Sequence, residues 1–153
     1  MMELHAFLRN LPAFEAFNDT HLHALMAALQ VEDCPDGYVF IHQGESNGAM
    51  FMILSGTVGV IRADAPGETR YAVRELRDGE VFGLLSLIDD MPAAATCVAQ
   101  GAVTIAALTR EAFDSLVEQA PPIAHQLRYM IAVQLARDLQ EQSEFLRRRM
   151  AGQ

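Results

Sequence analysis

The chain has 153 residues, of which 51% are hydrophobic and 20% charged. This length predicts one domain, and the composition excludes a disordered chain. No apolar run reaches the roughly 18 residues that a membrane-spanning helix needs, and residues 1–10 lack the basic start of a signal peptide. We therefore expect a cytoplasmic protein with no membrane partner.

The charge is strongly acidic and unevenly placed. A net charge of −9 comes from 20 acidic residues against 11 basic ones, all of them arginine. Residues 1–120 hold 17 of the acids and only 6 of the arginines. A body this acidic repels phosphate backbones, so we expect no nucleic-acid partner. The one basic run, Arg147–Arg149, is interpreted as a favourable charge match at a helix C-terminus.

Residues 1–30 are predicted to form helices. A second helix should begin near Asn18 or Asp19, because either side chain can accept a hydrogen bond from the first turn. Apolar residues then recur at helical spacing and would form one buried face. They are Leu22, Leu25, Met26 and Leu29.

Residues 31–109 are predicted to form a β-domain, because short β-rich runs alternate with turn signals such as Ser55-Gly56 and Gly101. The spacing of about ten residues leaves no room for crossover helices, which favours an antiparallel sandwich or barrel. The expected strands are Tyr38–His42, Met50–Leu54, Val58–Arg62, Tyr71–Leu76 and Val103–Leu108.

Residues 110–153 are predicted to be helical again. Thr109 can cap a first helix, and Pro121-Pro122 ends it and can start the next. That last helix would run from about Ile123 to Arg149, about 40 Å at 1.5 Å per residue. It is longer than a small domain is wide, so its far half needs a partner.

A second copy of the chain is the simplest partner for this helix. Four residues fall at the four-three-four spacing of a coiled-coil seam: Leu135, Leu139, Gln142 and Leu146. We therefore predict a homodimer, with Leu135, Leu139 and Leu146 in its helical seam.

Four glycine- or proline-containing segments carry a resemblance to a known family. Ile41–Glu45 and Met50–Val58 resemble the strand core of the cyclic nucleotide-binding domain family, as in effector domains of catabolite activator and Fnr-like regulators. Gly79–Ile88 and Pro92–Thr96 resemble the two ends of that family's phosphate-binding cassette, here residues 79–97. The resemblance implies a mainly β fold, a β-roll or jelly-roll barrel (double-stranded β-helix), with N-terminal helices and a long C-terminal helix.

The resemblance also implies a function and a site. The family is regulatory and not enzymatic, and its ligands are cAMP or cGMP. No catalytic residues and no metal site are expected. The cassette positions that would contact a ligand are Phe82, Gly83, Leu84, Leu85, Ser86, Ala93, Ala94 and Ala95.

Two cassette positions depart from the family pattern. A glutamate that accepts a hydrogen bond from the ribose is replaced by Leu84, and an arginine that pairs with the cyclic phosphate is replaced by Ala93. Each charged hydrogen bond contributes about 1.5–3 kcal/mol, and each 1.4 kcal/mol is about tenfold in affinity. We therefore expect cyclic nucleotide to bind weakly or in an altered form, and the module to signal through its C-terminal helix.

Two alternatives follow from the same departures. The apolar cassette could be filled by its own side chains, leaving a dimeric protein-interaction module with a non-functional pocket and an unidentified protein partner. Alternatively, the pocket could take a different ligand, such as a less charged metabolite or a haem with a histidine or cysteine axial ligand. The chain stops at Gln153 without a helix-turn-helix, so we expect a stand-alone effector domain.

Overall fold

The computed structural model describes residues 4–152, without the side chains of Asp138, Glu141, Gln142 and Phe145. The predicted seam residue Gln142 therefore lies outside the described side chains. The elements in chain order are α1 (Leu4–Asn10), α2 (Asp19–Ala28), β1 (Gln30–Cys34), β2 (Val39–Ile41), β3 (Ala49–Arg62), β4 (Tyr71–Leu76), β5 (Val81–Phe82), the 3-10 helix η1 (Leu84–Leu87), β6 (Thr96–Thr109), α3 (Arg110–Gln119) and α4 (Pro121–Ala151).

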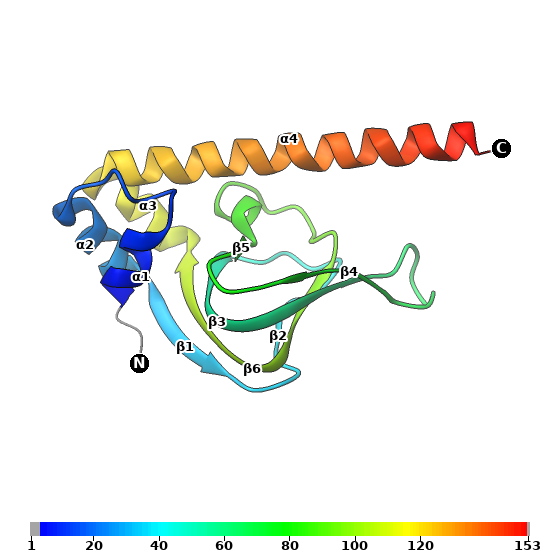
Figure 1. Cartoon of the computed structure of the whole chain (residues 1–153), viewed down its shortest axis with the longest axis horizontal. Helices are drawn as coiled ribbons and strands as arrows, with labels where there is room; N and C mark the ends of the chain where they lie inside the picture. The colour runs from blue at the N-terminus through cyan, green and yellow to red at the C-terminus, as the bar shows by residue number, and fades with distance from the viewer. Residues whose placement is uncertain (1–3, 153) are drawn as a thin grey trace.

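The strands form a rolled antiparallel sheet with the order β1-β6-β3-β4. The short strand β2 pairs with β6, and β5 pairs with β3. Helices α1, α2 and α3 gather at one end of the roll, and α4 runs along it (Figure 1). The predicted fold class, a mainly β roll with flanking helices, is confirmed.

The two longest strands pass through glycines that the sequence indicated as turns. Met50–Leu54 and Val58–Arg62 belong to one strand, β3, so the predicted turn at Ser55-Gly56 is wrong. Gly56 has a φ of +111° and lies where the β3–β6 register shifts, so it bends the strand as a bulge. Gly101, with a φ of +77°, likewise lies inside β6.

The helix starts follow the predicted capping chemistry. The Oδ1 atom of Asn18 accepts a hydrogen bond from the His21 N–H at 2.8 Å, and the Thr109 Oγ1 atom accepts one from Ala112 at 3.1 Å. Helix α4 begins at Pro121, two residues before the predicted Ile123. Proline fits there because the first turn of a helix has no intrahelical use for its N–H group.

Two apolar clusters hold the fold together. One lies inside the roll and includes Phe40, Val58 and Phe82. The other packs the helices against one end of the sheet, and its buried members include Leu8, Phe14, Leu22, Leu25, Met50, Leu84, Leu87, Leu108, Phe113, Leu116, Ile123 and Leu127. Because Leu84 and Leu87 belong to η1, this second cluster joins the cassette segment to the helices.

Gly56→Ala is expected to destabilise the protein by at least about 2 kcal/mol, because a side chain is strained at this backbone angle. A Cβ atom there would also lie 2.8 Å from the Ala102 carbonyl oxygen. Gly67→Ala is the control, since Gly67 has a φ of +83° but open space around it. We expect this control to lower the free energy of unfolding by about 1 kcal/mol. Urea unfolding measures the free energy of unfolding of both variants. Equal losses in the two variants would contradict the idea that the crowded bulge is what requires glycine at position 56.

Candidate ligand-binding site

A pocket of about 480 Å³ lies between the cassette segment, the inner side of β4 and helix α4. This volume is in the range of small-molecule sites. All eight cassette residues predicted from the sequence line it: Phe82, Gly83, Leu84, Leu85, Ser86, Ala93, Ala94 and Ala95. The cassette therefore borders an open space, which favours a ligand site over a pocket filled by its own side chains.

Helix α4 supplies one wall of this pocket. Leu135 and Leu139, predicted for a dimer seam, line the pocket together with Ile131 and Gln134. Leu146 is not among the lining residues and lies further along the helix. Any ligand that fills the pocket therefore contacts the C-terminal helix directly.

The turn into the pocket wall depends on Gly83. Its φ of +75° is in the left-handed region, and an added Cβ atom would lie 2.9 Å from the Ala49 carbonyl oxygen. Just before it, the Phe82 ring stacks on Phe51 with centroids 5.2 Å apart, which fixes the end of β5. Just after it, Leu84 begins the short helix η1.

The loop between β2 and β3 holds the other end of the cassette. Gly44 donates a backbone hydrogen bond to the Ala93 carbonyl at 2.9 Å, and the Ala93 N–H donates to Glu45 at 3.0 Å. Both main-chain groups of Ala93 are thus used by the protein, so this residue offers a ligand its methyl group. The hydroxyl of Ser46 donates to the Asp90 carbonyl at 2.6 Å.

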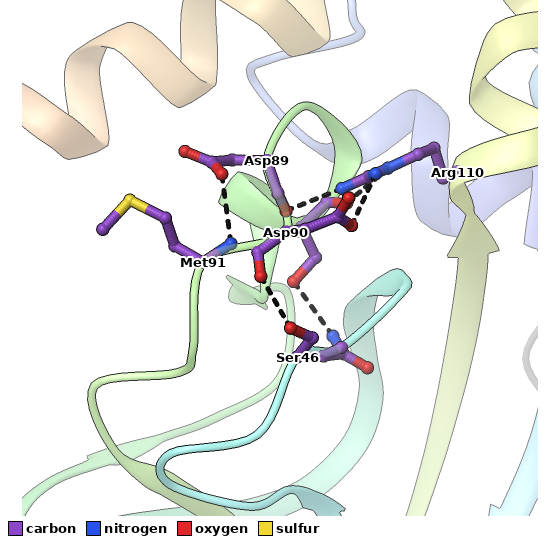
Figure 2. Close-up of polar contacts among 7 residues, drawn as sticks. Ser46, Asp89, Asp90, Met91 and Arg110 are labelled. Carbon is purple, nitrogen blue, oxygen red and sulfur yellow. Dashed lines mark hydrogen bonds and ion pairs between the residues drawn. The ribbon is translucent and has the colours of Figure 1, made fainter.

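Arg110 is a residue beside the site that the sequence reasoning missed. From the first position of α3 its guanidinium donates to the carbonyl oxygens of Ser86 (3.1 and 2.8 Å) and Asp89 (2.6 Å). It also pairs with the Asp90 carboxylate at 2.7 Å (Figure 2). Its place directly after the capping residue Thr109 gave no sign of this role, because the acceptors lie more than twenty residues earlier.

The pocket carries little charge. Among the described lining residues, Arg74 is the one basic side chain and Asp89 the one acidic side chain. Burial raises the pKa of the Cys97 thiol to about 11, although the nearby Arg74 guanidinium acts in the opposite direction. The Cys97 thiol is therefore protonated and neutral at pH 7.

The described residues give no support to a metal or haem ligand set. Within residues 4–152, no three His, Cys, Asp or Glu side chains come close enough together to hold a metal ion. No histidine is found among the described residues that line the pocket. In the part of the chain that is described, no helix is both long and apolar enough to cross a membrane.

The sequence profile of the cyclic nucleotide-binding domain family matches residues 31–120. The cAMP-dependent protein kinase regulatory subunit of Blastocladiella emersonii is 34% identical over 112 residues, which cover 73% of this chain and 28% of that protein. The cyclic AMP receptor protein of Thermus thermophilus is 30% identical over 128 residues, or 84% of this chain and 59% of that one. The chain thus spans only part of each relative.

Solved structures agree with the fold. The catabolite activator protein of Thermus thermophilus superposes with a TM-score of 0.76 and 27% identity, covering 88% of this chain and 62% of that chain. A cyclic nucleotide-binding domain from Methylobacillus flagellatus gives a TM-score of 0.75 at 24% identity, covering 90% of this chain and 77% of that one. At 24% identity, the similarity to this second structure shows a shared fold and nothing further.

Arg110→Ala is expected to lower the free energy of unfolding by about 2–3 kcal/mol, because three main-chain bonds from a charged donor are lost. Amide hydrogen exchange in residues 84–91 should rise as the segment loosens. Asp90→Asn is the matched control, since it removes only the ion pair to a carboxylate that is 80% exposed. We expect Asp90→Asn to lower the free energy of unfolding by less than about 1 kcal/mol. Equal effects would mean that the ion pair, and not the carbonyl contacts, holds the segment.

Proposed function

The chain belongs to the cyclic nucleotide-binding domain family, and we propose that it is a cytoplasmic, non-catalytic regulatory module that binds cyclic nucleotide weakly or in an altered form and signals through α4. The observation that carries this proposal is the open pocket whose wall includes Leu135 and Leu139 of that helix. A ligand can bias a two-state element only if it contacts the two states differently. Here the ligand pocket and the output helix share a surface.

Weak nucleotide binding is supported by the two replaced cassette positions. Leu84 is only 7% exposed and packs in the core beneath the helices, so it offers no acceptor to a ribose hydroxyl. Ala93 offers no positive charge to a phosphate. Two missing charged contacts correspond to a loss of about a hundredfold or more in affinity.

Signalling through α4 is supported by two links between the cassette and the C-terminal helices. Leu84 and Leu87 of η1 share one buried cluster with Phe113 of α3 and Leu127 of α4. Arg110 adds a polar link from α3 to the carbonyl oxygens of the cassette. A displacement of η1 by a ligand would therefore be passed to both helices, because packed cores move between discrete arrangements.

Calorimetric titration tests the nucleotide part of this proposal. Wild-type protein is expected to bind cAMP and cGMP with a Kd of about 1 mM, and Ala93→Arg to tighten cAMP binding at least about tenfold by pairing with the phosphate. Ala102→Arg is the control, because it adds the same charge at an exposed β6 position away from the pocket. Micromolar binding by the wild type, unchanged in Ala93→Arg, would contradict a weakened phosphate site.

A dimeric interaction module is a second candidate function, and the exposed face of α4 favours it. From Leu135 onward, every α4 residue whose side chain is described is exposed. Leu139 is 65% exposed and Leu146 59% exposed, at the spacing of a coiled-coil seam. Apolar side chains exposed along one helix face are typical of a protein interface. We propose that this face pairs with a second copy and presents the dimer to a protein partner.

Leu146→Asp and Leu135→Asp are both expected to shift the dimer to monomer without unfolding it, because a carboxylate in an apolar seam is left unpaired. Leu146→Asp is the sharper variant, since it does not touch the pocket. Gln140→Asp, which adds the same charge on another face of the exposed helix, should leave the dimer intact. Sedimentation equilibrium gives the mass, and an unchanged mass for both leucine variants would refute the seam.

A further inference from the structure

We infer that the ligand best matched to this pocket is an amphiphilic monocarboxylate, with an extended apolar body against the cassette and α4 and its carboxylate on Arg74. This inference rests on the proposed function and names the ligand class of the same pocket. The proposed carboxylate contact, Arg74, lies outside the eight cassette positions predicted from the sequence.

Arg74 is the one basic side chain among the described residues that line the pocket. It lies on β4 opposite Val60, and its guanidinium forms no hydrogen bond or ion pair with the residues that the structure describes. The other arginine at this end of β4, Arg77, pairs with Glu75 at 3.6 Å. A guanidinium fork matches the two oxygens of a carboxylate, so Arg74 is available to a carboxylate ligand.

Two polar side chains beside the cassette, Asn47 and Ser86, bond to each other. Asn47 donates from Nδ2 to the Ser86 hydroxyl at 3.1 Å and also to the Ala49 carbonyl. Cys97 is a neutral thiol, so it does not compete for the Arg74 charge. Arg74 therefore supplies the one positive charge that the described lining residues offer to a ligand.

The walls favour methylene groups over hydroxyls. The described aliphatic lining residues are Ile41, Val60, Leu76, Val81, Leu84, Leu85, Ile131, Leu135 and Leu139. A sugar hydroxyl placed against them loses its bonds to water and gains none in return, which lowers affinity by about tenfold or more per group. An alkyl or aryl body gains from the same surface by leaving water.

Asp89 limits the ligand to one negative charge. Its carboxylate also lines the pocket and accepts a hydrogen bond from the Met91 N–H at 3.0 Å (Figure 2). A second anionic group on the ligand would meet this carboxylate, and like charges in a partly desolvated pocket repel. The ligand is therefore expected to orient with its single carboxylate toward β4 and its apolar body toward the helices.

Calorimetry on the full chain with matched probe pairs tests this inference. The pairs are decanoate with decanol and 4-phenylbutyrate with 4-phenylbutanol, and cAMP is the reference. At least one carboxylate is expected to bind about tenfold or more tightly than its alcohol and than cAMP. Arg74→Gln should weaken that carboxylate about tenfold and leave the alcohol unchanged. Arg77→Gln is the matched control, because Arg77 does not line the pocket and should change neither.

Two results would overturn the inference: neither carboxylate binds better than its alcohol, or Arg74→Gln weakens the two members of a pair equally. Amide exchange in residues 131–139 of α4 separates this failure from failure of the proposed function. If cAMP alone protects α4, the regulatory module stands and the ligand class is wrong. If a carboxylate binds through Arg74 without changing exchange in α4, the ligand class stands and signalling through the helix is wrong.

Discussion

The hydrogen bonds of the Arg110 guanidinium place the pocket wall relative to the helices. The carbonyl oxygens of Ser86, inside η1, and of Asp89, just after it, both accept hydrogen bonds from this one side chain. Buried or half-buried carbonyl groups need such partners. Since Arg110 is also the first residue of α3, the shape of the cassette and the start of the C-terminal helices are set by the same contact.

Apolar packing reinforces this polar link at one position that changes the chemistry of the site. Leu84 follows the left-handed turn at Gly83, where the family pattern has a carboxylate, and it joins the core formed by the helices. The same side chain therefore removes a sugar acceptor from the pocket and adds to the contact between η1 and α4. A substitution of Leu84 would therefore change both the chemistry of the pocket and the packing between η1 and α4.

The electrostatics of the pocket differ from those of the whole chain. The net charge of −9 repels anions at long range, although salt screens this over about 10 Å. Inside the pocket, Arg74 supplies one positive charge and Asp89 supplies one negative charge among the described lining residues. In the ligand class that we propose, specificity for an anion would come from a short-range contact with this single guanidinium and not from the overall field.

The sequence by itself determined a mainly β fold class between helices and the helix caps at Asn18 and Thr109, because these depend on local periodicity and capping groups. The segment that borders the pocket came from the resemblance of its glycine- and proline-containing stretches to a known family. It misplaced the turn at Ser55-Gly56, since a left-handed glycine can bend a strand as well as end it. Only the tertiary structure decided that Arg110 holds the cassette, that Arg74 enters the pocket and that α4 closes one wall. Those contacts join residues far apart in the chain, and sequence spacing carries no information about which distant side chains meet.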